Sequence, residues 1–422
     1  MGISIIKASS VVLLLAPLAA LLAARVQVLS LAYFNAPVRM PKHANFTSYE
    51  IKFADQIRNC EDAVLVEARG LALLACDPGR ETWNTVMVGY SPRNSFLTTY
   101  KSYQRQGDFV DGAEPDPNAG LYAYNYGNVS LPDDEALKRI EVIGFDSELR
   151  TIGFEYHEPS STLFVTNHGR QGSRIEQFHL DLEALTATHI ATIAHRLINI
   201  PNSIAAVGDS EFYVTNQHYF TSREHPLLWA VETYLAPPLA SIVHVRILPN
   251  GTVDAAVVAR QAYPNGIVLL NDTTLAVAAT SQRTVNLYAV SQPAAQAQAH
   301  PTLKLESSFW LPFLPDNLAV SKSDGALLVA GHPHLPSLGK FARSRRICHR
   351  PDVLEEQGQE ARDMCASVGA ASWASEWTPE AGVEHIYAGW EYPTAASVVR
   401  DRERGVGILA GLYAKGLLVW RD

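Results

Sequence analysis

The chain has 422 residues, of which 47% are hydrophobic and 18% are charged. This composition is typical of an ordinary globular protein and excludes disorder on a large scale. A formal net charge of −9, with no long run of Lys or Arg, argues against nucleic acid as a partner, because phosphate binding requires clustered cations.

The N-terminal region predicts export. Residues 11–24 are an apolar run of Val, Leu and Ala with one Pro, preceded by Lys7. A run of this length is typical of the core of a signal peptide, and the longer segment interrupted at Arg25 is also long enough to anchor the chain in a membrane. We therefore expect residues 1–35 to be a signal peptide or signal anchor, and the protein to be extracellular or membrane-anchored with its body outside the cytoplasm. Four N-glycosylation sequons fit this localisation, at Asn45, Asn128, Asn250 and Asn271.

Short β-type runs bounded by turn residues recur along the chain. They are residues 63–66, 71–75, 163–166, 212–215, 275–278, 327–330 and 406–412. Four of them place a valine between an apolar pair and a small residue, at Val165, Val214, Val277 and Val329, with steps of about 49, 63 and 52 residues. This period is the size of a four-stranded blade and predicts an all-β propeller over residues 36–422. A β-sandwich is the main structural alternative.

Other segments interrupt the repeat. Helical periodicity is scarce, and the best candidates are residues 227–234 and 353–366. Residues 104–120, 291–301 and 337–377 are predicted to be surface loops or insertions. The arginine cluster Arg343-Ser-Arg-Arg346 is interpreted as a solvated loop face.

Four cysteines in an exported chain predict two disulfides, with three possible connectivities. Residues 61–68 and 71–75 have the pattern of two strands joined at Arg69-Gly70, which would place Cys60 opposite Cys76. Cys348 then pairs with Cys365 around a polar loop. The alternative, that all four cysteines are reduced and buried, is weaker in an exported protein.

Four short segments carry side-chain oxygens suited to one hard cation. They are Asn59-Cys60-Glu61-Asp62, Pro201-Asn202-Ser203-Ile204, Pro264-Asn265-Gly266-Ile267 and Pro315-Asp316-Asn317-Leu318. Calcium takes six to eight oxygens and tolerates mixed carboxylate and amide ligands. Each segment alone also has an ordinary structural explanation, because Asn, Asp and Gly are common in turns.

These segments, together with Leu163-Phe-Val-Thr-Asn-His168 and residues 204–220, resemble the serum paraoxonase/arylesterase family. The resemblance covers roughly residue 50 to the C-terminus and implies a six-bladed β-propeller with a catalytic calcium at one mouth of its central tunnel. The calcium ligands it implies are Glu61, Asn202, Asn265, Asp316 and Asn317. It also implies a second, structural calcium near Asp62, although Ser203 stands where the family has Asp and removes one anionic ligand.

The same resemblance implies a catalytic role for His168, as the second histidine of the family's proposed His–His proton relay. The first histidine is missing, because Glu148-Leu149-Arg150-Thr151 stands where the family has Pro-His-Gly-Ile. The structural alternative is that His168 is a hydrogen-bonded residue at the end of a strand. His218 and His332 match family histidines near the tunnel and are expected to shape the pocket.

The family's disulfide between the chain ends is also absent, because residues 417–422 contain no cysteine. Closure of the fold is therefore predicted to rest on strand pairing.

The sequence thus predicts a calcium-dependent hydrolase of small lactones or aryl esters, in which Ca²⁺ polarises the carbonyl and stabilises the oxyanion. A first alternative is a non-catalytic, calcium-stabilised propeller that binds a partner or lipid. A second is a lyase like strictosidine synthase, which does not need this ligand set. The sequence contains no Gly-x-Ser-x-Gly elbow and no His-Glu-x-x-His zinc helix.

Overall fold

The computed structural model describes residues 20, 22–82, 116–169, 171–222, 225–291 and 299–422. Most of the expected signal or anchor segment, residues 1–19 and 21, lies outside the described residues. Residues 22–29 are helical, and a short helix α2 follows at Leu31–Phe34. Among the described helices, none has the length and apolar character needed to span a membrane.

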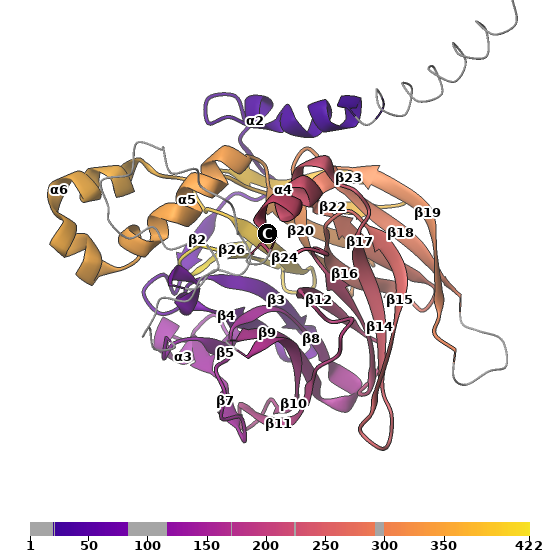
Figure 1. Ribbon diagram of the computed structural model, residues 1–422. Helices are drawn as coiled ribbons and strands as arrows, with labels where there is room; N and C mark the ends of the chain where they lie inside the picture. The colour runs from indigo at the N-terminus through magenta and orange to yellow at the C-terminus, as the bar shows by residue number, and fades with distance from the viewer. Residues whose placement is uncertain (1–19, 21, 83–115, 170, 223–224, 292–298) are drawn as a thin grey trace, which may run out of the picture.

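The described residues form six sheets that follow one another along the chain (Figure 1). The first contains β3 (Cys60–Val66), β4 (Leu71–Cys76), β5 (Gly120–Asn125) and β6 (Leu137–Arg139). The second contains β8 (Thr151–His157), β9 (Thr162–Gly169), β10 (Gly172–Asp181), β11 (Thr186–Ile193) and the parallel strand β7 (Glu141–Ile143). The third contains β12 (Pro201–Ala206), β13 (Glu211–Asn216), β14 (Ala240–Ile247) and β15 (Val253–Gln261).

The other three sheets repeat this antiparallel order. The fourth contains β16 (Pro264–Asn271), β17 (Thr274–Ala279), β18 (Thr284–Ser291) and β19 (Thr302–Trp310). The fifth contains β20 (Leu314–Val320), β21 (Leu327–His332), β22 (Ser372–Thr378), β23 (Gly382–Gly389) and the short β1 (His43–Ala44). The sixth contains β24 (Ala395–Asp401), β25 (Val406–Gly411), β26 (Leu417–Arg421) and β2 (Tyr49–Lys52).

The repeated sequence pattern forms the second strand of four of the six sheets. Residues 163–166, 212–215, 275–278 and 327–330 lie in β9, β13, β17 and β21. These strands are buried on both faces. Their sequences are therefore continuous runs of apolar and small residues and do not alternate between apolar and polar residues. The predicted unit of four antiparallel strands is confirmed, and six sheets replace the two that a β-sandwich would need.

The first strands of the six sheets form a ring of contacts. Each contacts the first strand of the next sheet, in the order β3, β8, β12, β16, β20 and β24, and β24 contacts β3. The N-terminal strand β2 pairs with the C-terminal strand β26, from Tyr49 opposite Trp420 to Lys52 opposite Leu417. Strand pairing therefore joins the N-terminal strand β2 to the C-terminal strand β26.

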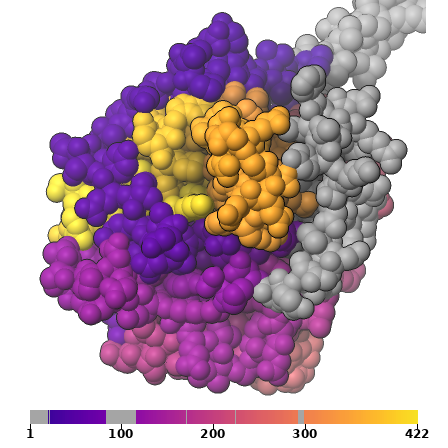
Figure 2. Space-filling model, turned by 90° about the vertical axis from the view of Figure 1, so that its left-hand side faces the viewer, coloured from indigo at the N-terminus to yellow at the C-terminus, as the bar shows by residue number. Residues whose placement is uncertain are grey.

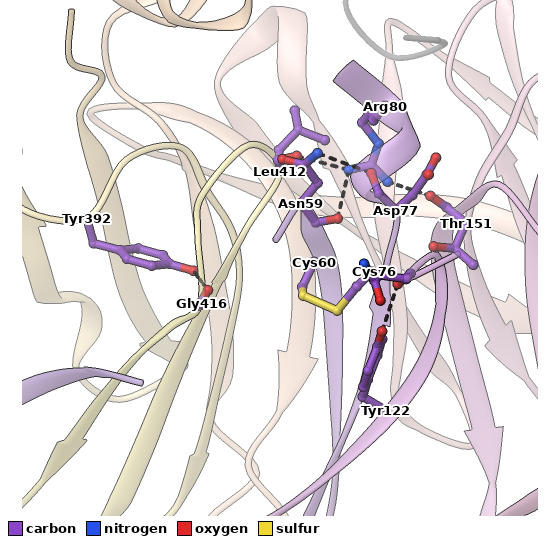
Figure 3. Close-up of a disulfide and its surroundings, with 11 residues drawn as sticks. Asn59, Cys60, Cys76, Asp77, Arg80, Tyr122, Thr151, Tyr392, Leu412 and Gly416 are labelled. Atoms are coloured by element: carbon purple, nitrogen blue, oxygen red, sulfur yellow. Dashed lines mark hydrogen bonds between the residues drawn. A yellow bond between two sulfur atoms is a disulfide. The ribbon is translucent and has the colours of Figure 1, made fainter. Parts of the chain in front are cut away.

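The disulfides join Cys60 to Cys76 and Cys348 to Cys365, as the sequence predicted. Cys60 and Cys76 are directly opposite each other on β3 and β4, and Figure 3 shows this bond beside Arg80 and Asp77. The second bond joins Cys348, the last residue of helix α5 (Leu335–Cys348), to Cys365 near the end of helix α6 (Pro351–Ser367).

Helices decorate the ring. They are α3 (Asp133–Ala136), α4 (Pro226–Leu235), α5 (Leu335–Cys348) and α6 (Pro351–Ser367), with 3₁₀ turns at Glu67–Arg69, Pro78–Glu81, Glu158–Ser160 and Thr280–Gln282. The two predicted helices are confirmed in α4 and α6.

The prediction of a loop before α6 is wrong, because residues 335–348 form helix α5. This helix begins after His334, whose side chain accepts a hydrogen bond from the Ser337 backbone N–H, and a proline lies in its first turn. Within it Arg345 is only 2% exposed, so the interpretation of residues 343–346 as a solvated face fails at this position.

Candidate metal centre

All six first strands begin with an irregularity in their pairing. The register shifts between Cys60 and Asp62, Thr151 and Phe154, Pro201 and Ile204, Pro264 and Ile267, Pro315 and Leu318, and Ala395 and Ser397. A bulge leaves residues unpaired and re-aims their side chains. Three of the irregular segments begin with proline, which lacks the N–H needed for regular pairing. The five predicted ligands all lie in four of these irregular segments.

The structure brings the predicted ligands together in the interior. Their exposed fractions run from 0% for Glu61 to 4% for Asn265 and Asp316. Asn317 Nδ2 donates a hydrogen bond to the backbone carbonyl of Glu61 at 3.2 Å, which links residues 256 positions apart. Gly266 lies against the backbone of Asp316 and Asn317, with no room for a Cβ. Neither of two surface pockets, of ≈ 340 and ≈ 530 Å³, is lined by these residues.

Five oxygen atoms of this group are buried without a donor among the described residues. They are both carboxylate oxygens of Glu61 and Oδ1 of Asn202, Asn265 and Asn317. The amides of two asparagines are fixed in orientation, because Asn202 Nδ2 donates to Gln217 Oε1 at 3.0 Å and Asn317 Nδ2 to Ser397 Oγ at 3.1 Å. An unsatisfied buried polar group costs about 1–3 kcal/mol, so these five oxygens call for a compensating interaction. A set of carboxylate and amide oxygens fits Ca²⁺.

The carboxylates of the centre repel one another. Burial, followed by the charges of Asp316 and Asp62, raises the pKa of Glu61 well above its usual range. Such an arrangement is costly unless a cation compensates it. Among the described residues no cluster of three or more His, Cys, Asp or Glu is arranged to hold a metal ion. An ion here would therefore depend on the amide oxygens as well as on the two carboxylates.

Asp62 differs from the five other predicted ligands because both its oxygens have protein partners. Oδ1 accepts hydrogen bonds from Ala63 N at 2.9 Å and Ser397 Oγ at 2.8 Å, and Oδ2 accepts one from Phe154 N at 3.2 Å. Burial raises its pKa to about 6. In this structure Asp62 ties β3 to the first strands of both neighbouring sheets, and its role in a second calcium site stays a prediction.

His332 and His168 both brace the ligand segments. His332 Nε2 lies 2.8 Å from Asp316 Oδ2. His168 Nε2 donates to the carbonyl of Pro201 at 2.7 Å, because a carbonyl oxygen only accepts, while Nδ1 accepts from Ser173 Oγ at 3.0 Å. Burial lowers the pKa of His168 to about 4, so the ring is neutral at physiological pH with both nitrogens engaged.

His218 lies beside this centre with one free nitrogen. Its Nε2 is hydrogen-bonded to Thr233 Oγ1 of α4 at 2.8 Å, and its ring packs on Tyr263 with centroids 4.3 Å apart. Nδ1 is buried without a partner among the described residues, and burial lowers the pKa of His218 to about 3. The residue is a neutral part of the wall between the centre and α4.

Arg80 is a buried residue of this region that the sequence reasoning missed. It donates to three backbone carbonyls, those of Asn59 at 3.3 Å, Leu412 at 3.0 Å and Thr151 at 2.5 Å (Figure 3). These carbonyls belong to three different sheet units that meet beside Glu61. No sequence pattern marked Arg80, because its role depends on contacts with residues far along the chain.

The segment without the relay histidine has an arginine in a salt-bridge network. Arg150 Nη1 lies 3.4 Å from Asp77 Oδ1, and its Nε lies 3.2 Å from Glu148 Oε2. Because two carboxylates engage the guanidinium, and because a guanidinium has donors but no acceptor, it does not replace a histidine base.

The asparagines of the four sequons are all exposed, so glycosylation at Asn45, Asn128, Asn250 and Asn271 stays a sterically reasonable prediction.

Comparison with known proteins shows that part of the chain is similar to arylesterases. A family model described as Arylesterase matches residues 150–344. The dog protein "Serum paraoxonase/arylesterase 2" is 32% identical over 180 residues, which cover 41% of this chain and 45% of that protein. The mouse protein "Serum paraoxonase/arylesterase 1" is 27% identical over 224 residues, covering 49% of this chain and 58% of that protein. Residues 150–344 are thus similar to the serum paraoxonase/arylesterase family.

The match is partial. The chain spans about half the length of the curated relatives that it matches. Among solved structures, the periplasmic gluconolactonase of Pseudomonas aeruginosa aligns with a TM-score of 0.43 and 11% identity, over 85% of this chain and 80% of that one. The region matched by the Arylesterase family model includes Asn202, Asn265, Asp316 and Asn317 but ends before Cys348 and does not reach back to Glu61.

Proposed function

We propose that this protein is a calcium-dependent hydrolase of lactones or aryl esters. The observation that carries the proposal is the set of five buried, unpartnered oxygens contributed by Glu61, Asn202, Asn265 and Asn317, with Asp316 beside them. Similarity to the paraoxonase/arylesterase family over residues 150–344 supports the reaction class. When bound, calcium supplies a Lewis acid for the ester carbonyl and for the charge that develops on its oxygen.

The proposed ligands have separate roles. Glu61 and Asp316 would supply two negative charges, which balance a dication without exceeding its charge. Asn202, Asn265 and Asn317 would supply neutral oxygens and leave coordination positions for water and substrate. His332 would hold the Asp316 carboxylate, and Ser397 would fix the amide of Asn317 through its hydrogen bond.

His168 would act mainly as a positioning residue. Its hydrogen bond to the Pro201 carbonyl fixes the backbone directly before the ligand Asn202. A pKa lowered to about 4 makes the ring a weak base, and Ser173 occupies the nitrogen that would accept a proton. Its assignment as a catalytic base is therefore the less favoured of the two roles, and proton transfer would fall to water or to another group.

The fold and localisation belong to the same proposal. The ring of first strands and the six antiparallel sheets support a six-bladed β-propeller over residues 36–422, with the metal centre at one end of the ring. Residues 1–35 would direct the chain to the secretory pathway, as signal peptide or anchor.

A membrane association is proposed from the exposed apolar residues at one end of the molecule. The N-terminal helical region and α4 both lie at the upper end in Figure 1. Their exposed apolar side chains are Leu22, Val26, Leu29, Tyr33, Phe34, Leu227, Leu228, Val231, Tyr234 and Leu235. An apolar surface of this kind is suited to the interfacial region of a bilayer.

The function is tested with purified protein, phenyl acetate, and one γ- and one δ-lactone, assayed with calcium and with excess chelator. Hydrolysis that disappears with chelator and returns with calcium supports the proposal. The rival, a calcium-stabilised propeller that only binds a partner, predicts calcium binding with no hydrolysis of any of the three compounds.

A further inference from the structure

Arg345 occupies a position where a hydrophobic residue would be expected. Leu338, Ala342 and Arg345 succeed one another at spacings of four and three residues, so all three lie on one face of α5. All three are buried. Leu338 and Ala342 pack in one cluster with Ile152, Ala396, Leu412 and Tyr413. A charged side chain that continues a core-facing stripe is costly and requires compensation.

The guanidinium of Arg345 is not compensated by hydrogen bonds. The side chain is 2% exposed, and Nε and Nη1 have no partner among the described residues. Nη2 makes one long bond, of 3.4 Å, to the backbone carbonyl of Arg80. Since Nε carries one hydrogen and Nη1 two, three N–H groups are left without an acceptor.

The nearby charges do not supply an anion dedicated to Arg345. Glu81 interacts with it electrostatically, but Glu81 Oε1 already accepts a hydrogen bond from Arg58 Nε at 2.8 Å and lies 3.3 Å from His349 Nδ1. Arg80 and Arg346 add positive charge. Burial lowers the pKa of Arg345 to about 10, as expected for a cation that lacks a full counter-charge.

The side chain is nevertheless held in a fixed orientation. Its guanidinium stacks on the ring of Tyr413, 3.6 Å from the ring centroid. Stacking uses the flat face of the group and leaves its N–H edge free for a planar acceptor. The geometry is therefore that of a preorganised anion site in which the cation is oriented before the anion arrives.

Arg345 lies beside the two sheets whose first strands, β8 and β24, carry no predicted calcium ligand. Ile152 and Ala396, on which α5 packs, occupy the irregular segments of the two sheets without a predicted calcium ligand. These sheets flank β3, which carries Glu61. Arg80 connects the two regions, because it contacts Arg345 through its backbone and donates to the carbonyl of Asn59, two residues before Glu61.

We propose that Arg345 binds a carboxylate group of the substrate, so that this protein prefers esters or lactones that carry a free carboxylate. The proposal rests on the hydrolase function above and names its substrate class. A carboxylate matches the planar, forked donors of a guanidinium and would satisfy the N–H groups that the protein leaves open. The opposite end of the same substrate would then face the ligand-bearing sheets.

The test compares monophenyl succinate with the neutral ester phenyl butyrate, using the calcium-loaded protein and three variants. Arg345→Met keeps an unbranched side chain without the charge, and Arg345→Lys keeps the charge without the planar fork. Arg343→Met is the matched control, because Arg343 is exposed on the same helix. We expect the ratio of kcat/KM for the two esters to favour the anionic one, to fall about 10- to 100-fold in Arg345→Met, and to be unchanged in Arg343→Met.

Binding of succinate is measured in parallel by calorimetry, with inorganic phosphate as the other anion. The dissociation constant of succinate should rise about 10- to 100-fold in Arg345→Met and less in Arg345→Lys. Equal binding of phosphate and succinate, or succinate binding that survives Arg345→Met, would overturn the proposal. If neither ester is hydrolysed, the hydrolase function fails, and the succinate titration still decides the role of Arg345. If Arg345→Met does not fold, the comparison of Arg345→Lys with Arg343→Met decides it.

Discussion

Gly266 is not a proposed calcium ligand, but its replacement by alanine should disrupt the metal centre. A Cβ at this position would lie 2.6 Å from Asn317 Cα and 2.6 Å from Leu318 N, and 2.7 Å from the carbonyl oxygen of Asp316. These are backbone atoms, so rotation of a side chain cannot relieve the contact. Overpacking in a tight interior typically costs 1–3 kcal/mol, and we expect a value of about 2–3 kcal/mol here. If the strain is relieved by displacing Asp316 and Asn317, calcium affinity should fall roughly 30- to 150-fold.

The assay is urea unfolding with and without calcium, combined with a calcium titration. The control is Gly208→Ala, because a Cβ at Gly208 meets no atom within 4 Å. That variant should stay close to the wild type in stability and calcium affinity, with at most a small gain from the stiffer unfolded chain. If Gly266→Ala bound calcium as tightly as Gly208→Ala and unfolded at the same urea concentration, the close approach of β16 and β20 would not position the ligands.

Three further predictions concern buried groups. Arg80→Met should lower the free energy of unfolding by about 3–5 kcal/mol, because three backbone carbonyls lose their donor. The control Arg69→Met, at an exposed ion pair, should change the free energy of unfolding by less than about 1 kcal/mol. Equal losses in urea unfolding of the two variants would contradict this prediction. Acidification below pH 6.5 should lower the free energy of unfolding by up to about 1.4 kcal/mol per pH unit for each buried histidine, since burial lowers the pKa of His168 and His244 to about 4 and of His218 to about 3 while the unfolded chain takes up protons near 6.5. The raised pKa values of Glu61 and Asp62 act in the opposite direction, so the measurement is the difference in urea stability between the wild type and His244→Gln, and a difference that stays constant from pH 7 to pH 5 would refute the prediction. His168→Ala should slow hydrolysis by about 10²-fold or less at full calcium occupancy, while Asp316→Ala abolishes it; equal loss in both variants with calcium retained would make His168 the essential base.

The strands could be predicted from the sequence because they are local patterns, whereas the ligand set rests on the family resemblance and stays a prediction. The buried second strands are short apolar runs, and a repeat of such runs predicts repeated sheets. Asn202, Asn265 and Asp316 each follow a proline, and proline at the first position of a strand is itself a signal for irregular pairing. What the sequence did not reveal is that all six first strands share this irregularity, which appears only when the register of each pair is known.

The missed features depend on contacts between distant parts of the chain. Helix α5 has many charged residues and no clear apolar stripe, because the third position of its buried face is Arg345. A helix prediction there would have needed the knowledge that an arginine is buried. Arg80 lies in a short 3₁₀ turn, and its three acceptors come from residues 59, 151 and 412. Neither residue could be assigned a role before the ring brought these segments together.

The most direct test of the central claim is to compare calcium binding and ester hydrolysis on the same metal-depleted sample. Calcium is titrated into the protein, and bound metal and the rate of phenyl acetate hydrolysis are measured at each free concentration. We expect one tightly bound calcium per chain to restore hydrolysis, with the same half-saturation for both curves, and Asp316→Ala to lose both together. Full hydrolysis in the metal-depleted protein, or one calcium bound with no hydrolysis of phenyl acetate or either lactone, would contradict it.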